Sequence, residues 1–394
     1  MTVTPARGPA GGNHIAGFDG MRAISVALVI ATHSGVLRWL EGAGVLNDVT
    51  LTAFQGYTGV QVFFVLSGFI ITYLMIREQR ATGRVRLKAF FIRRALRILP
   101  LYYLALAVTI MASLWISPIV SQESVLFAAT FTTNFIPRAW YSTSLGHTWS
   151  LAVEEHFYLI WPLAVILLAR YRWDRLLLWL LGACAGLTVL GALLLSSTYL
   201  VEHFRVLGWT PISGIHIAMG CAAAIFSTGP QYATARSRLL SPSRAAWVPV
   251  ILFVLSLFLQ QASELAGTLL RTVAIAHFVS WVFMHQSSRV VRMLSHPVLV
   301  YLGTISYGLY IWQGFFLSTG PYRASGQAWP PSPQVGVLLV LLVAPLSYHL
   351  FEKPILSLKA RLVSGSRTGE RTAGHNASGT TTTSARDAID ALPR

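Results

Sequence analysis

The sequence predicts an all-α integral membrane protein, a bundle of about ten transmembrane helices, and three observations support this fold class. The 394-residue chain is 54% hydrophobic and only 11% charged, with a mean hydropathy of +0.58, whereas a soluble globular protein carries about 25% charged residues. The apolar residues gather in runs close to the ~20 residues that cross a bilayer as a helix. Lys and Arg residues concentrate between alternate runs, as expected of loops on the cytoplasmic side.

The predicted spans, in chain order, cover residues 20–40, 57–76, 98–117, 149–169, 176–196, 208–227, 246–260, 268–285, 298–317 and 335–352. With the N-terminus inside the cell, all Lys and Arg residues face or flank the cytoplasm except Arg38, Arg138, Arg205, Arg271 and Arg323. This distribution predicts that both termini are cytoplasmic. The net charge of +16 therefore reflects membrane topology, and we expect no nucleic-acid partner.

The chain is predicted to have one folded domain. Residues 1–17 form a short cytoplasmic N-terminus, residues 18–360 a transmembrane domain, and residues 361–394 a polar, disordered cytoplasmic tail. Cys184 and Cys221 stand singly inside apolar segments, without the spacing of metal ligands. We therefore expect a multi-pass protein of the cytoplasmic membrane with no metal site.

The first span carries two ionisable side chains, Arg22 and His33. Arg22 lies near the inner interface, where it either extends its charge to the headgroups or holds a phosphate or carboxylate of a substrate. His33 lies about 16 Å further along a continuous helix, past the midplane and about seven residues before its outer end. It is either a packed histidine bonded to nearby backbone or a general base, and we favour the base because neutral imidazole takes a hydroxyl proton near neutral pH.

The fourth span carries two adjacent carboxylates, Glu154 and Glu155. Ionisable groups at membrane depth are costly and usually functional. Neighbouring side chains on a helix point about 100° apart, so one glutamate should face the site and the other a polar partner. The depth of this pair roughly matches that of His33, and an imidazole and a carboxylate are therefore expected to meet there. A structural ion pair or a protonated carboxyl group is the alternative.

Residues 77–97 form the most strongly charged segment, with one acidic residue, Glu78, among eight basic ones. Arg93, Arg94 and Arg97 are spaced three or four residues apart, which predicts a tight basic patch where a helix enters the third span. Guanidinium groups suit phosphate oxygens. The patch is therefore a candidate site for a phosphate-bearing donor such as an acyl-coenzyme A, or for anionic lipid headgroups; a simple topological anchor would explain part of it.

Two further segments are candidates for helix packing or for a polar cavity. Gly59, Ser67 and Gly68 permit close approach of helices. The polar residues of 303–313 either line a cavity or form hydrogen bonds between helices. The candidate cavity-lining residues are Trp149, Ser150, Ser306, Tyr307, Tyr310 and Gln313.

Six segments taken together resemble the acyltransferase-3 family of integral-membrane O-acyltransferases. They are FDGMRAISVALVIATHS (18–34), GYTGVQVFFVLSGFIIT (56–72), FFIRRALRILPLYY (90–103), HTWSLAVEEHFYLIWP (147–162), GTISYGLYIWQ (303–313) and FEKP (351–354). They occur in order over nearly the whole membrane region. The specific elements are an arginine and a histidine separated by ten residues, an Arg-x-x-Arg pair and a Trp-Ser-Leu-x-x-Glu set.

The resemblance implies a membrane enzyme that moves an acyl group from acyl-CoA, as co-substrate and without a bound cofactor, to a hydroxyl. It implies that His33 is the catalytic base with Arg22 as its motif partner, and that Glu154 matches the family glutamate. Arg94 and Arg97 match the paired arginines. Gln313 departs from the family, which often has histidine there. We expect a compact member without an extracytoplasmic hydrolase-like domain, acting on a macrolide-like natural product or on surface sugars.

The resulting hypothesis is that His33 takes the proton of the acceptor hydroxyl while Glu154 orients the imidazole. Direct transfer and an acyl-enzyme intermediate both stay open. The competing functional class is a proton-coupled transporter or lipid flippase, in which the same His and Glu would relay protons. A non-catalytic scaffold would leave these intramembrane groups unexplained.

Overall fold

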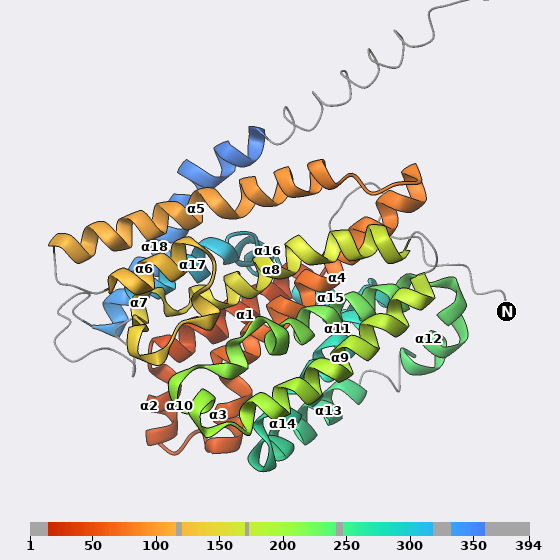
Figure 1. Cartoon of the computed structure of the whole chain (residues 1–394), viewed down its shortest axis with the longest axis horizontal. Coiled ribbons are helices and arrows are strands. Elements are labelled where there is room, and N and C mark those ends of the chain that lie inside the picture. The colour runs from red at the N-terminus through yellow and green to blue at the C-terminus, as the bar shows by residue number, and fades with distance from the viewer. Residues whose placement is uncertain (1–14, 116–119, 170–172, 242–246, 318–331, 359–394) are drawn as a thin grey trace, which may run out of the picture.

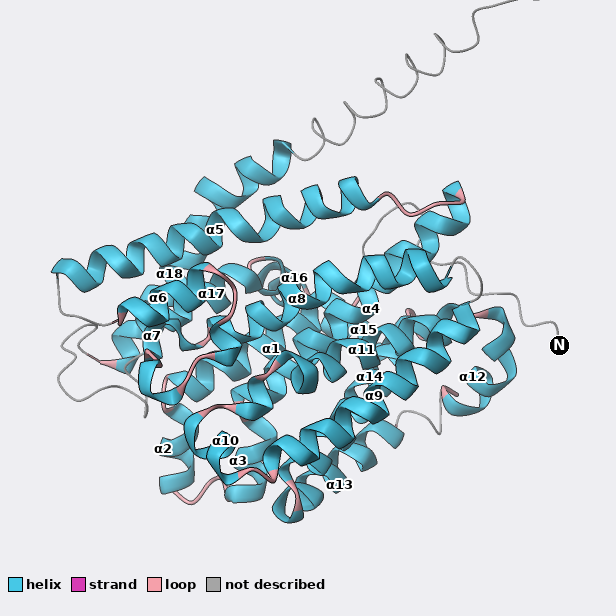
Figure 2. Cartoon of the chain, viewed as in Figure 1, coloured by secondary structure: helices cyan, strands magenta, loops and turns pink. Residues whose placement is uncertain are grey.

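The computed structural model describes residues 15–115, 120–169, 173–241, 247–317 and 332–358. Within these ranges every regular element is a helix (Figure 2), which confirms the predicted all-α class. A single isolated bridge pairs Pro137 with Phe204. The predicted tail 361–394 and most of the predicted N-terminal segment lie outside the described residues.

The described chain has both short and long helices, which are labelled in Figure 1. They are α1 (Phe18–His33), α2 (Val36–Gly42), α3 (Asp48–Phe54), α4 (Gly56–Thr82), α5 (Leu87–Trp115), α6 (Gln122–Ala129), α7 (Thr143–Gly146), α8 (Thr148–Ala164), α9 (Trp173–Leu195), α10 (Thr198–His203), α11 (Thr210–Thr228), α12 (Ala233–Leu239), α13 (Val248–Ala262), α14 (Glu264–Met284), α15 (Arg289–Leu294), α16 (Pro297–Thr304), α17 (Ser306–Phe316) and α18 (Pro333–Ser347). π-helical turns over Val165–Ala169 and Tyr348–Glu352 extend α8 and α18.

Seven helical segments of the described chain are long and apolar enough to cross a membrane, and the bent pair α1 and α2 would make an eighth. The predicted span 246–260 corresponds to α13, which has 15 residues, and 298–317 is divided between α16 and α17. Each predicted span therefore contains a helix. The count of ten and the cytoplasmic location of the termini stay predictions.

The first span is not the continuous helix that the sequence predicted. Helix α1 ends at His33, and the chain turns by 65° into α2. Gly35 makes the turn because its φ of 78° lies in the left-handed region that glycine adopts without steric cost. His33 is consequently the last residue of α1 and lies at a bend.

Helix α4 is the centre of the bundle because it packs closely against α1 and α11. A side chain on Gly68 would overlap the Ile217 carbonyl oxygen of α11, and one on Gly59 would overlap the Ser25 carbonyl oxygen of α1. The predicted packing role of these two glycines is thus confirmed. Helix α5 runs along one edge of the bundle and α13 along the opposite edge (Figure 1), and apolar side chains of α1, α4, α5, α8, α17 and α18 form one core cluster.

Candidate active site

A cavity of about 80 Å³ lies inside this cluster, between α1, α4, α5, α8 and α17. A water molecule needs about 10–15 Å³ by this measure, so the cavity has room for several waters or a short acyl group. It brings together eight of the sequence-predicted residues. These are Arg22, Arg94, Arg97, Ser150, Glu154, Ser306, Tyr307 and Tyr310.

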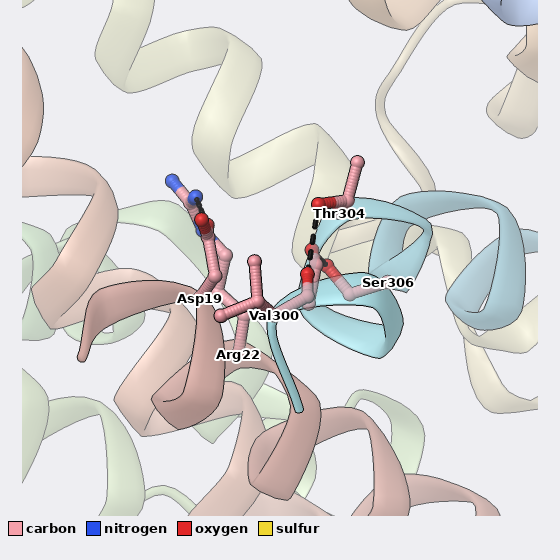
Figure 3. Close-up of polar contacts among 6 residues, drawn as sticks. Asp19, Arg22, Val300, Thr304 and Ser306 are labelled. Atoms are coloured by element: carbon pink, nitrogen blue, oxygen red, sulfur yellow. Dashed lines mark hydrogen bonds and ion pairs between the residues drawn. The ribbon is translucent and has the colours of Figure 1, made fainter. Parts of the chain in front are cut away.

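Three guanidinium groups gather at one end of the cavity, which we call the arginine end (Arg22, Arg94 and Arg97). Arg22 donates from Nη1 to Asp19 Oδ1 at 2.8 Å, and Figure 3 shows this pair beside the turn between α16 and α17. The Arg94 guanidinium lies 4.3 Å from the centre of the Tyr158 ring, at cation–π distance. Arg97 also lines the cavity and is exposed.

Glu154 is the carboxylate of this cavity. It accepts hydrogen bonds from the hydroxyls of Ser67 and Tyr158, both at 2.9 Å, and the charges of Arg94 and Arg22 act on it. Glu155 does not line the cavity. The neighbouring carboxylates therefore face different surroundings, as their helical spacing requires.

The side chain of His33 has one ring nitrogen committed to the backbone. Its Nδ1 lies 2.8 Å from the Val29 carbonyl oxygen, and because a carbonyl only accepts, Nδ1 must carry the proton. Nε2 is then left with a lone pair. The half-buried His33 thus has the local backbone bond of a packed histidine and, at the same time, the tautomer that a general base needs.

The expected direct pairing of His33 with Glu154 is wrong. The two side chains have separate hydrogen-bond partners, and His33 is absent from the cavity lining. The physical reason is that α1 ends at His33 and α8 begins at Thr148, so the neighbour of His33 is His147, at the start of α8. Glu154 lies nearly two helical turns further along.

Polar side chains connect the surroundings of His33 with the cavity. Ser150, which lines the cavity, lies 2.6 Å from the Tyr310 hydroxyl, and this hydroxyl donates to the His147 carbonyl oxygen at 2.9 Å. His147 in turn lies within electrostatic range of His33. The imidazole and the cavity are therefore linked through α8 and α17 and not by direct contact.

Two residues beside His33 were missed by the sequence analysis, and with it they form what we call the histidine end (His33, His147 and Arg205). Arg205 lies within electrostatic range of His33, is exposed, and donates to the Tyr141 hydroxyl at 2.7 Å. The signal for Arg205 was its place among the few basic residues outside the positive-inside pattern. His147 lies two residues before the Trp-Ser-Leu-x-x-Glu set, which begins at Trp149.

Besides His33 and Glu155, three predicted site residues lie away from the cavity lining. Arg93 is half-buried, with Glu78 and Arg86 as its charged neighbours. The Trp149 ring stacks on Tyr57 with centroids 6.1 Å apart. Gln313 is fully buried, and neither atom of its amide group has a hydrogen-bond partner within the described ranges.

The structure adds one carboxylate near the arginine end. Glu352 lies in the π-helical turn that follows α18, where the charge of Arg97 acts on it and Ser347 donates to it at 3.3 Å. It belongs to the FEKP segment, whose role the sequence did not suggest. Over the described ranges no group of three His, Cys, Asp or Glu side chains is arranged to hold a metal ion.

Comparison with known proteins gives one family. The acyltransferase domain Acyl_transf_3 matches residues 15–351. Peptidoglycan O-acetyltransferase OatA of Listeria monocytogenes is 28% identical over 367 residues, which cover 87% of this chain and 56% of the relative. O-acetyltransferase OatA of Staphylococcus aureus is 27% identical over 368 residues, covering 87% of this chain and 57% of the relative.

The chain thus spans little more than half the length of these relatives. No solved structure matches it. The family match covers most of the chain, including α1, α4, α5, α8 and α17, which build the cavity. The chain belongs to the acyltransferase-3 family.

Proposed function

We propose that this protein is an O-acyltransferase of the cytoplasmic membrane. It would move an acetyl or other short acyl group from acyl-CoA to a hydroxyl of a sugar, a glycan or a macrolide-like natural product. The observation that carries the proposal is the cavity, in which three guanidinium groups stand at one end of a small chamber. The relatives named O-acetyltransferases support the same chemistry.

The arginine end suits the phosphates of the donor. Arg94 and Arg97 present guanidinium forks that match phosphate oxygens, and Arg97 both lines the cavity and is exposed. The apolar part of the cavity lining, which includes Val60, Phe63 and Leu151, would accept the acyl group. A chamber of about 80 Å³ favours a short acyl chain.

In the proposed reaction His33 is the general base. Its Nε2 lone pair accepts the proton of the acceptor hydroxyl while the oxygen attacks the thioester carbonyl. The new carbon–oxygen bond forms, the carbon–sulfur bond breaks, and the leaving thiolate takes the proton from the imidazolium. Coenzyme A and the acylated acceptor are the products, and His33 returns to its starting state.

Glu154 has a different role in this scheme from the one expected from the sequence. It holds the hydroxyls of Ser67 and Tyr158 and offsets part of the positive charge of the arginine end. It therefore shapes the donor site. It makes no contact with the base.

The test uses the full chain, purified in detergent, with acetyl-CoA and candidate hydroxyl acceptors. We expect release of free CoA that depends on the acceptor, together with an acetylated product identified by mass spectrometry. Comparison of the glycans and metabolites of cells with and without the gene would identify the natural acceptor. A protein that transported acetyl-CoA or acceptor without cleaving the thioester would contradict the proposal.

A further inference from the structure

The largest fully buried side chain outside the cavity is a charged one. Arg271, on α14, is 1% exposed, and α14 is one of the segments able to cross the membrane. Its Nε donates to the Gln61 amide oxygen of α4 at 2.6 Å, while its Nη1 has no hydrogen-bond partner in the described part of the chain. A cation buried in this way is costly and usually marks a functional role.

The chemistry of Arg271 fixes the orientation of the Gln61 amide. Arginine only donates, so the Gln61 amide oxygen must face Arg271. The Gln61 amide nitrogen then donates to the Thr268 carbonyl oxygen at 3.0 Å and to the Thr272 hydroxyl at 3.1 Å. Both of its protons are used, and the amide cannot be flipped without losing all three bonds.

The same reasoning extends to the imidazole of His216 on α11. The Thr272 hydroxyl points its proton at the Thr268 carbonyl oxygen at 2.9 Å, and in this arrangement it accepts from His216 Nδ1, which lies 2.7 Å away. With the proton on Nδ1, His216 Nε2 is an acceptor. The Tyr57 hydroxyl, 3.3 Å from Nε2, is then the donor of that hydrogen bond.

This chain of hydrogen bonds ends at the wall of the active site. The ring of His216 stacks on Phe64, which lines the cavity, with centroids 6.2 Å apart. The ring of Tyr57 stacks on Trp149. The backbone N–H of Gly56, the residue before Tyr57, donates to the Thr32 hydroxyl at 2.6 Å, so the start of α4 adjoins the end of α1 that carries His33.

The donating role of the Tyr57 hydroxyl leaves its oxygen free to accept. Ser213 is the other hydroxyl beside it, and Ser213 donates its own proton to the Leu207 carbonyl oxygen at 2.6 Å. Ser213 has only one hydroxyl proton, and with that proton on the Leu207 carbonyl oxygen it contacts the phenolic oxygen without donating to it. Its lone pairs are available to a hydroxyl of a bound molecule.

We propose that Tyr57 binds the acyl acceptor by accepting a hydrogen bond from an acceptor hydroxyl, and that Arg271, Gln61, Thr272 and His216 are positioning residues that hold the Tyr57 oxygen in place. The inference rests on the proposed O-acyl transfer. It assigns the substrate class at the histidine end as a molecule with at least two hydroxyls, one held by Tyr57 and one acylated beside His33.

The experiment is a double-mutant cycle on the full chain, with acetyl-CoA as donor and a soluble peptidoglycan disaccharide as the acceptor probe. Tyr57→Phe removes only the phenolic oxygen and should raise the acceptor KM about two- to tenfold, the range of one hydrogen bond, with the donor KM unchanged. Thr272→Val breaks the chain between Gln61 and His216 and should have a similar, smaller effect. Thr188→Val is the matched control, because the Thr188 hydroxyl donates only to the Cys184 carbonyl oxygen of its own helix.

The double variant separates positioning from general destabilisation. If Thr272 acts through Tyr57, adding Thr272→Val to Tyr57→Phe should cause no further rise in acceptor KM. An equal rise in both backgrounds, or a Tyr57→Phe protein with unchanged acceptor KM, would overturn the proposal. If the native protein acetylates no hydroxyl acceptor, the proposed function fails instead. The melting temperatures of the variants then test the hydrogen-bond network. A loss in the double variant that is smaller than the sum of the two single losses supports the network, and an additive loss rejects it.

Discussion

The arginine end and the histidine end of the site are both anchored on helix α1, yet they are built from different chemistry. Arg22, Arg94 and Arg97 carry permanent charges, and acidic and aromatic side chains surround them. At the histidine end, His33 is tied by Nδ1 to a backbone carbonyl, and His147 packs edge-on against the Tyr310 ring. One end is suited to binding an anion and the other to moving a proton.

The distance between the ends has a physical reason. An imidazole beside three guanidinium groups would be a poor base, because its protonated form would be repelled. Arg22 and His33 are separated by about 16 Å along α1, given a rise of 1.5 Å per residue. Phosphate binding and proton transfer at opposite ends of one helix are therefore kept from interfering with each other.

The largest expected effect tests the histidine end. His33→Ala should lower kcat by about 10²- to 10⁴-fold, the usual contribution of a positioned general base, with little change in donor KM. The measurement is acceptor-dependent CoA release by the purified variant. His285→Ala is the matched control, since His285 makes the same Nδ1 contact to the carbonyl oxygen four residues earlier, at 2.9 Å. A near-normal kcat in the His33 variant would show that His33 is not the general base.

A smaller effect is expected at the arginine end. Arg94→Ala and Arg97→Ala should each raise the donor KM about tenfold or more, because each removes a charge-assisted hydrogen bond to phosphate. Arg93→Ala should change it much less, since Arg93 does not line the cavity. Lys88→Ala, on the exposed start of α5, is the control for loss of surface charge. Equal effects of all four changes would mean that the segment acts only as a diffuse positive surface.

The smallest effect decides to which end Glu154 belongs. Glu154→Gln preserves the shape of the side chain and a hydrogen-bonding oxygen for Ser67 or Tyr158, but it removes negative charge beside Arg94 and Arg22. We expect the donor KM to fall about two- to fivefold as the site becomes more positive. The pH dependence of kcat should stay as in the native protein. A shifted pH profile with unchanged donor KM would instead connect Glu154 to the base.

Sequence reasoning succeeded where a local pattern was enough. The arginines of α5 were expected to share a patch from their helical spacing, and Arg94 and Arg97 do line one cavity. Gly59 and Gly68 were expected at close helix contacts, and the overlaps with neighbouring carbonyl oxygens confirm this. The cavity-lining role of Ser150, Ser306 and Tyr310 was one of two open interpretations.

Sequence reasoning failed where depth had to be compared between helices. His33 and Glu154 were paired by counting residues from the ends of two predicted spans, but α1 stops at His33 and α8 starts at Thr148. The single turn at Gly35 is enough to change the depth expected for His33 relative to Glu154. Gln61 and Arg271 lie 210 positions apart, and no periodicity in either segment indicates that they meet.

The amino-acid sequence by itself determined that this chain is a bundle of apolar helices with a basic patch at the start of α5 and ionisable groups along α1 and α8, because hydrophobicity and helical spacing are properties of single segments. Only the tertiary structure decided which of these groups share a cavity and that His147 is the neighbour of His33. It also decided that a chain of hydrogen bonds connects the buried Arg271 with Tyr57. Those outcomes depend on where each helix begins, bends and crosses its neighbours. Such geometry is set by close packing between segments distant in the chain.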